Sequence, residues 1–490
     1  MKYRLHVALA LLALTLVLIS CGQAAEPPAR GSTGPTTAPQ AAAPTAPQAA
    51  APTTAPQAAA PTANAAAKPA ATTAPAGASS TTAAPAASGS AVELRMTWYN
   101  DGNEGEVMRD ILNKFEAQNP GIKVVMDTVA FKDIHNILQA QVEAGSPPDL
   151  ARVTDQARFI GKYLDLRPYL KDPNAWSANW SDQVLGALRK ADDKQGLYGF
   201  PSQFTVTGPF INRTLFQQAN IPVPSDTKDK VTWDEWIDAA KKVAAATRTP
   251  YAVAMDRSGH RFWSPSISMC AKYVDPSTGK FTVDSPGFRK AANMLISWHK
   301  DKITPPEVWA GGGGGYAAAN DFFTNGQLVF YQSGSWQISQ FQKQIGDKFE
   351  WDAVPTPTGD CGSTAIPGGA YIVAFAASKH PKEVGMLVDY LTREDVLGDF
   401  SARSLFLPGH IGLAKKGIQY PSNSKQLNVF LSQIPNIQPE AYTLQYHPLG
   451  PTLNTEIRDR LSQVIVGELT LDDAIKRVQD KMDTAQAQQK

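Results

Sequence analysis

The chain has 490 residues, and its charges nearly balance, because 46 Lys and Arg face 45 Asp and Glu for a formal net charge of +1. No basic stripe or acidic block stands out, which argues against nucleic acid as a partner. The seven histidines are scattered. Neither His-Glu-x-x-His nor a cysteine-rich metal spacing occurs, so we expect no metal site and no cofactor.

Residues 1–20 are predicted to be a targeting segment. Lys2 and Arg4 form a basic start, and an uncharged, mostly apolar run follows from 7 to 19. This run is too short to span a bilayer comfortably. It ends in Leu-Ile-Ser-Cys-Gly at 18–22, which resembles the lipobox of bacterial lipoproteins. The resemblance implies acylation of Cys21 and cleavage before it. An ordinary signal peptide that contains a cysteine is the alternative.

Residues 21–91 are predicted to be a lipidated N-terminus followed by a disordered linker. From residue 22 the segment is mainly Ala, Pro, Thr, Gln and Ser, without aromatic residues. Such a composition buries too little apolar surface to offset the loss of chain entropy on folding. Its prolines favour extended conformations, so it is interpreted as a spacer, with a binding role as the alternative. No later apolar run reaches membrane-spanning length, so the lipid would be the only anchor.

The folded region begins with alternating strand and helix patterns. Apolar residues alternate over 92–98 and predict a strand, whereas the spacing over 107–115 predicts a helix that ends before Pro120. Residues 122–129 predict a second strand, 131–144 a second helix, and a short strand follows residue 149. This order indicates a mainly parallel sheet covered on both faces. Ligands of such sheets bind at the carboxyl ends of strands, here residues 98–101 and 154–155.

Several short motifs appear in an order typical of one family. They are Trp-Tyr-Asn-Asp at 98–101, Lys-Phe-Glu-Ala-Gln-Asn-Pro-Gly-Ile-Lys-Val at 114–124, Gly-Ser-Pro-Pro-Asp at 145–149, Tyr-Gly-Phe-Pro at 198–201, Phe-Ile-Asn at 210–212, Thr-Trp-Asp-Glu-Trp at 232–236, Asn-Gly-Gln at 325–327, Gly-Ser-Trp at 334–336 and Pro-Gly-Gly-Ala-Tyr at 367–371. Together they resemble the extracellular solute-binding proteins of family 1, which are maltose-binding-protein-like and feed sugar ABC importers. The resemblance covers residues 92–490.

The resemblance implies an α/β fold of the periplasmic-binding-protein type, with two α/β lobes and a hinge that the chain crosses three times. Lobe one would comprise 92–206 plus 360–395, and lobe two 207–355 plus 396–490. The crossings would fall near 205–208, 355–362 and 393–398. One local feature stands on the residues alone, because Thr232 and Glu235 have the spacing of a capping box at a helix start.

A sugar presents hydroxyls at its edge and C–H groups on its faces, so its site needs aromatic platforms and polar acceptors. The aromatic candidates are Trp98, Trp263, Trp336 and Tyr371; the family commonly stacks sugar on the aromatic at Trp336. Gly369 precedes Tyr371 closely and would let a ligand approach the backbone. Simple packing is the alternative for each aromatic ring.

The polar candidates for hydroxyl contacts are Asn100, Asp101 and Asp155, all at predicted strand ends. Asp101 could instead cap the following helix. Gln203 lies just before the first predicted crossing and is a weaker candidate. Cys270 and Cys361 could form a disulfide, since the chain is expected to be exported to an oxidising compartment. Two separate buried thiols would look the same in the sequence, so both alternatives stay open.

The resemblance implies a sugar ligand and ABC permease subunits as partners, with the chain a monomer held outside the cytoplasm. A lipid-anchored glycoside hydrolase is the competing class and would need two carboxylates held across a sugar. The adjacent pairs at 192–193 and 472–473 point in different directions on a helix, so neither fits. A surface adhesin on a stalk is the third class, and the linker suits it equally well.

Overall fold

The structure is a computed structural model that describes residues 91–190, 192–311 and 315–488. The predictions for residues 1–90, which include Cys21 and nearly all of the linker, lie outside these described residues. Within them, every helix is too short or too polar to cross a membrane.

Eight strands form one sheet in the order β2-β1-β3-β8-β4-β6-β5, with β7 paired to β4. Their bounds are β1 (Val92–Trp98), β2 (Ile122–Thr128), β3 (Leu150–Val153), β4 (Gly199–Asn212), β5 (Tyr251–Met255), β6 (Leu328–Gly334), β7 (Trp351–Ala353) and β8 (Pro367–Ala374). The pairs β1–β2, β1–β3 and β5–β6 are parallel. All pairs that involve β4 or β8 are antiparallel. The sheet is therefore mixed: the predicted parallel pairing holds among β1, β2 and β3 and again between β5 and β6, whereas β4 and β8 join these groups by antiparallel pairing.

The first lobe has a hydrophobic core on each face of its part of the sheet. Leu150 and Ile372 point to one core, while their neighbours Ala151 and Tyr371 point to the other. This alternation is the period of two expected for strands buried on both faces. Its helices are α1 (Glu104–Gln118), α2 (Phe131–Glu143), η1 (Gln156–Phe159), α3 (Pro173–Ser177), α4 (Asp182–Gly186), α13 (Pro381–Leu391), α14 (Glu394–Ser404) and α15 (Ile411–Lys416).

The second lobe is built around a single larger core that contains the buried residues of β5 and β6. Its helices are α5 (Arg213–Ala219), α6 (Pro224–Thr227), α7 (Trp233–Thr247), α8 (Gly259–Ser268), α9 (Pro286–Lys300), α10 (Pro306–Trp309), α11 (Ala319–Thr324), η2 (Ser335–Gln337), α12 (Ile338–Ile345), α16 (Ser424–Gln433), η3 (Ile434–Asn436), α17 (Pro439–Tyr446), α18 (Gly450–Ile465) and α19 (Leu471–Gln488). The capping box predicted at Thr232 and Glu235 is confirmed at the start of α7.

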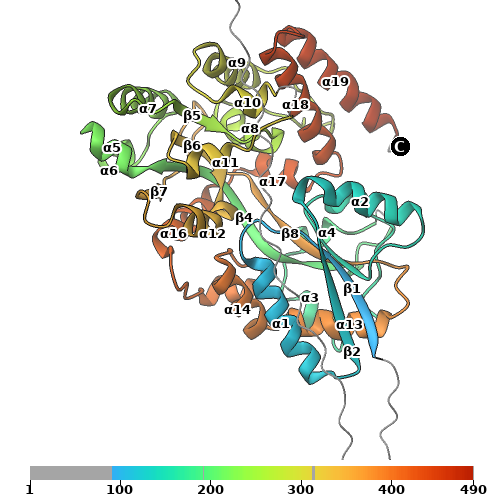
Figure 1. Cartoon of the computed structure of the whole chain (residues 1–490). Coiled ribbons are helices and arrows are strands. Elements are labelled where there is room, and N and C mark those ends of the chain that lie inside the picture. Colours follow the sequence, from blue (N-terminus) through green and yellow to red (C-terminus); the bar gives the residue numbers. More distant parts are fainter. Residues whose placement is uncertain (1–90, 191, 312–314, 489–490) are drawn as a thin grey trace, which may run out of the picture. The chain divides into compact units, whose positions relative to one another are not determined.

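Strand β4 belongs to both lobes (Figure 1). Its residues up to Val206 pair with β8, and from Thr207 they pair with β6. The Ile366 amide donates to Thr207 Oγ1 over 2.7 Å, and the Val206 amide donates to Ser335 Oγ over 3.2 Å. The chain therefore passes between the two lobes where β4 and β8 lie side by side, with both strands hydrogen-bonded at the passage.

The return from the first lobe to the second lies further along the chain than residue 395. Helix α14 packs against α1, and its Leu397 and Phe400 belong to a first-lobe core, as does Leu413 of α15. Leu405 and Leu407 also reach the second-lobe core, but only from Leu427 onward do all the core residues belong to the second lobe. We therefore propose lobe limits of 92–206 plus 367–413 and of 207–366 plus 427–490. The predicted boundary differs because α14 pairs with a helix almost 300 residues earlier.

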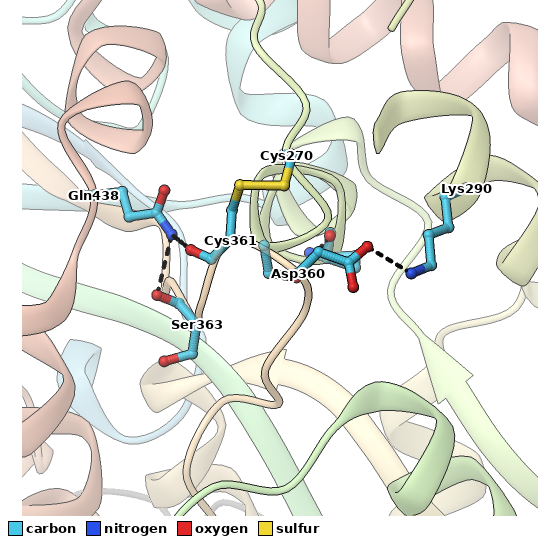
Figure 2. Close-up of a disulfide and its surroundings, with 8 residues drawn as sticks. Cys270, Lys290, Asp360, Cys361, Ser363 and Gln438 are labelled. Carbon is cyan, nitrogen blue, oxygen red and sulfur yellow. Dashed lines mark hydrogen bonds and ion pairs between the residues drawn. A yellow bond between two sulfur atoms is a disulfide. The ribbon is translucent and has the colours of Figure 1, made fainter. Parts of the chain in front are cut away.

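Cys270 and Cys361 form a disulfide, with Cα atoms 5.2 Å apart (Figure 2). Of the two alternatives left open by the sequence, the bonded one holds. Figure 2 also shows the surrounding contacts: Gln438 Nε2 donates to the carbonyls of Cys361 and Ser363, and Lys290 pairs with Asp360 over 2.7 Å. The disulfide thus fastens the segment that leads into β8 to the end of α8.

Candidate functional site

Arg152 organises the carboxyl edge of the first-lobe strands. It lies within β3, its side chain is fully buried, and its guanidinium is 4.0 Å from the centre of the Tyr99 ring. Its Nη1 donates to Glu104 Oε1 over 2.6 Å, and its Nη2 donates to Asp101 Oδ2 over 2.9 Å and Gln203 Oε1 over 2.7 Å. A buried cation with this many acceptors is stable only while they remain in place, so these side chains form one unit.

Asp101 presents the accessible carboxylate of this unit. Its side chain is 20% exposed, whereas that of Glu104 is fully buried and accepts from the backbone amides of Asp101 and Gly102. Burial raises the pKa of Asp101 to about 6, against the opposing charge of Arg152 and with the support of Glu104. The charge of Arg261 in the second lobe makes the smallest contribution and lowers that pKa.

In the second lobe, Asp256 follows directly after β5 and gathers polar partners. Its carboxylate accepts hydrogen bonds from the Tyr331 hydroxyl and from Ser333 Oγ, the latter over 2.7 Å. Gln337 Nε2 donates to the same Tyr331 and Ser333 hydroxyls. Arg261 Nε lies 3.4 Å from Asp256 Oδ2, so the carboxylate also holds this guanidinium.

Trp336 lies where the two lobes meet. Its ring is partly buried and packs against a core of the first lobe, although the residue itself belongs to the second. The Arg261 guanidinium covers the ring at 4.0 Å from its centre, a cation–π contact. A Cβ on Gly334 would lie 2.0 Å from the ring, so the glycine makes room for it. Arg261 and Trp336 thus form a polar and aromatic pair at the junction, where Ser339 Oγ also donates to Asn103 Oδ1 of the first lobe over 2.8 Å.

Two predicted stacking residues, Trp98 and Trp263, lie in hydrophobic cores in this structure, and their contact with a ligand stays a prediction. Trp98 is 0% exposed, contacts Phe400 edge to face, and donates to Asn100 Oδ1 over 2.9 Å. Trp263 is 2% exposed in the second-lobe core. The packing alternative given for each aromatic ring therefore describes both residues in this structure.

Tyr371 and Gly369 also serve packing. Tyr371 is 3% exposed, and its hydroxyl donates to the Val184 carbonyl over 3.4 Å. A Cβ on Gly369 would lie 2.3 Å from the Gln203 carbonyl oxygen on β4. The missing side chain at Gly369 therefore lets β8 approach β4, which is a different reason for glycine from the predicted approach of a ligand.

The other two predicted polar residues, Asn100 and Asp155, lie in different places. Asn100 is exposed next to Asp101, and its side-chain oxygen is engaged by Trp98. Asp155 is partly buried, pairs with Arg158 over 3.0 Å and receives no contact from Arg152 among the described residues. Asp101 and Trp336 are thus the predicted residues that the structure brings to the junction, and their contact with a ligand stays a prediction.

Three residues of the junction, Arg152, Asp256 and Arg261, were not predicted from the sequence. Arg152 could have been found, because it is a charged residue inside an otherwise apolar strand and such a residue needs partners. Asp256 follows a strand, as Asp101 does. Ligands of such sheets bind at the carboxyl ends of strands, and the same reasoning applied to β5 would have predicted Asp256. Arg261 has no comparable signal, because its position over Trp336 arises only in the fold.

No group of three or more His, Cys, Asp and Glu side chains among the described residues is placed to hold a metal ion. A surface cavity of about 670 Å³ lies between α14 and α15, lined by Arg393, Glu394, Asp399 and Lys416 among others. None of the predicted ligand residues lines it.

Comparison with known proteins identifies the family. The sequence profile of the bacterial extracellular solute-binding proteins matches residues 99–397, which is more than half of the chain. The chain belongs to this family. A relative named multiple sugar-binding protein from Streptococcus mutans is 24% identical over 317 residues, which cover 61% of this chain and 71% of the relative. A putative binding protein from Brucella abortus is 24% identical over 370 residues, covering 72% of this chain and 84% of that protein.

Solved structures show the same fold. Maltose-bound MalE3 of T. maritima aligns with a TM-score of 0.67 at 20% identity, covering 81% of this chain and 100% of that one. The substrate-binding protein of Listeria monocytogenes in complex with cycloalternan aligns with a TM-score of 0.64 at 22% identity, covering 81% and 99%. The two-lobed α/β architecture of this solute-binding protein is thus that of the structural neighbours.

Proposed function

We propose that this protein binds a mono- or oligosaccharide between its lobes and delivers it to a membrane ABC permease. The observation that carries the proposal is the junction itself, where Trp336 of the second lobe packs against a first-lobe core beneath the Arg261 guanidinium. Three residues further on, Ser339 Oγ donates to Asn103 Oδ1 over 2.8 Å, which brings the loop that carries Asp101 to the same junction. An aromatic ring beside carboxylate and guanidinium groups is the combination that a sugar requires, since it presents apolar faces and polar edges. The carbohydrates named for the relative from Streptococcus mutans and for the solved structures support the same ligand class.

Contacts from both lobes would make binding and closure one process. A ligand that touches both lobes stabilises the closed arrangement by its difference in affinity for the closed and open states. The strand passages at Val206–Thr207 and Ile366–Pro367 are the places where the chain would bend. In small-angle scattering, the radius of gyration of the protein should decrease when the sugar that it binds is added.

A screen by thermal shift and calorimetry tests the ligand class, with maltose, maltotriose, cyclic oligosaccharides and monosaccharides as probes. A ligand that binds only the folded state raises the melting temperature. If no member of such a panel shifts it, the carbohydrate assignment fails. Release of shortened sugars on prolonged incubation would contradict a binding protein and favour a hydrolase.

Trp336 supplies the matched variants for the same test. Trp336→Ala should weaken binding of the positive probe by about 1.5–3 kcal/mol, because it removes a stacking surface. Trp336→Phe keeps an aromatic face and should retain most of the affinity. Trp351→Phe, at the other partly buried tryptophan, is the control for effects on the fold. Equal affinities for wild type and Trp336→Ala would remove Trp336 from the site.

The location of the protein and its partners are also proposed. We infer that Cys21 is acylated, that the lipid holds a monomer outside the cytoplasm, and that the closed form docks on permease subunits. Cys21→Ser should move the protein from the membrane fraction to the medium or periplasm, and mass spectrometry of the wild-type N-terminal peptide should show the lipid. Light scattering measures the oligomeric state, and a dimer would contradict the expected monomer.

A further inference from the structure

His260 connects the Arg261–Trp336 pair to the strand that passes between the lobes. Its Nε2 lies 3.2 Å from the carbonyl oxygen of Pro367, the first residue of β8. Its Nδ1 lies 3.2 Å from Nη1 of Arg261, whose guanidinium covers the Trp336 ring. The imidazole therefore contacts a passage strand on one side and the aromatic platform on the other.

The chemistry of the two neighbours determines the form of the ring. A carbonyl oxygen can only accept a hydrogen bond, so Nε2 must carry the proton that points at Pro367. A guanidinium can only donate, so Nδ1 must be unprotonated and accept from Arg261. Only the neutral imidazole with its proton on Nε2 satisfies both contacts. A proton on Nδ1 would place an N–H and a positive charge against Arg261.

The surroundings of the ring favour the same form. His260 is the second residue of α8, and a positive charge at a helix N-terminus is unfavourable. The side chain of Gln445 on α17 acts in the opposite direction and raises the pKa of His260, and the Trp263 ring lies 5.5 Å away between centroids. Arg261 is the charged neighbour among these groups. Burial and this charge lower the pKa of His260 to about 3.

The backbone of His260 is fixed independently of its ring. Its amide donates to Asn454 Oδ1 on α18 over 2.9 Å. A Cβ on the preceding Gly259 would lie 2.4 Å from the Asn454 carbonyl oxygen, so glycine permits this close approach of α8 and α18. A substitution of the imidazole alone should therefore leave the start of α8 in place.

We propose that His260 is a positioning residue that holds Arg261 over Trp336 and ties this platform to β8 at the passage between the lobes. Movement of Pro367 relative to the second lobe is then transmitted to the ring on which the ligand would stack. The part of this inference that concerns ligand affinity rests on the proposed function. The part that concerns the ring of Trp336 does not.

Two measurements need no ligand. In protein labelled with ¹⁵N-histidine, the His260 resonances should show a protonated Nε2 and an unprotonated Nδ1 at neutral pH. Acrylamide quenching of Trp336, obtained by difference against the Trp336→Phe background, should increase in His260→Leu. It should return toward wild type in His260→Gln, because an amide can donate to Pro367 and accept from Arg261. An Nδ1-protonated ring, or unchanged quenching in His260→Leu, would overturn the proposal.

The ligand measurement uses maltotriose, or whichever sugar of the panel gives the largest thermal shift. His260→Leu should bind it about 10-fold more weakly, since two hydrogen bonds that fix the platform are lost, and His260→Gln should recover most of that loss. Equal affinities for wild type and His260→Leu would overturn the role in binding. If the wild-type protein binds no sugar while quenching and tautomer are as expected, the proposed function fails and the positioning role stands. If His260→Leu does not fold, the tautomer of the wild-type protein and the His260→Gln variant decide.

Discussion

Removal of the Cys270–Cys361 disulfide should destabilise the protein strongly, and the size of the effect can be worked out from the structure. The bond joins residues separated by 91 positions, so it restricts a long loop in the unfolded chain. The chain-entropy relation assigns about 4.6 kcal/mol to a loop of this length at room temperature. The hydrogen bond from the Cys361 amide to the Ser268 carbonyl, 2.8 Å long, needs no disulfide and should persist. We therefore expect Cys270→Ser/Cys361→Ser to lose roughly 3–5 kcal/mol of unfolding free energy.

Urea unfolding followed by circular dichroism measures this loss, with wild type in dithiothreitol as the matched control. The reduced wild-type protein and the double variant should have the same midpoint, because both lack the bond and keep the rest of the contacts. A loss below about 1 kcal/mol would refute the reasoning, since the loop entropy would then already be limited by residual structure in the unfolded chain. A reduced wild type that is clearly more stable than the variant would show that the serines themselves disturb the packing.

Three further changes follow from the same structure. Arg152→Met should lower the unfolding free energy by about 3–5 kcal/mol in urea titrations, because it leaves the buried carboxylate of Glu104 without its cation. A loss under about 1 kcal/mol would contradict the interpretation of Arg152 and its acceptors as one unit. Gly369→Ala should lose about 1–3 kcal/mol, because its Cβ would meet the Gln203 carbonyl, and unchanged stability would show that β8 shifts freely. The pKa of His260 is about 3 in the folded protein and about 6.5 in an unfolded chain, so only the unfolded chain binds this proton between those values. Wild-type stability should therefore fall as pH drops from about 6.5 toward 3, by at most about 1.4 kcal/mol per unit from this group. His260→Gln should lack this part of the slope, and parallel pH profiles would contradict the assignment.

The early elements of the first lobe could be predicted because the spacing of apolar residues along these segments indicates a strand or a helix. The strand at 92–98 and the helix that ends before Pro120 appear as β1 and α1. These patterns report which side chains are buried, and burial in turn follows from the period of each element. The antiparallel pairing of β8 was not visible, because β8 joins β3 and β4 from 367 onward and nothing local to that segment specifies its partners.

The candidate site could be predicted only in part for a related reason. Asp101 follows from its place at a strand end, and Trp336 from the family motif. Trp98 occupies a similar place, yet its ring contacts Phe400 on α14, some 300 residues later in the chain. Whether an aromatic ring faces solvent or a distant helix is decided by tertiary packing, which the spacing of apolar residues does not reveal.

The sharing of β4 between the two lobes has a consequence for how the protein unfolds. Each lobe without β4 would expose the edge of a neighbouring strand, β8 in one lobe and β6 in the other. A fragment cut between Val206 and Thr207 would leave both halves with an open edge, and such edges promote aggregation. Calorimetry should therefore find one cooperative transition for the folded region, in which neither lobe survives the melting of the other. Separately expressed halves should be recovered as a folded protein only when they are produced together.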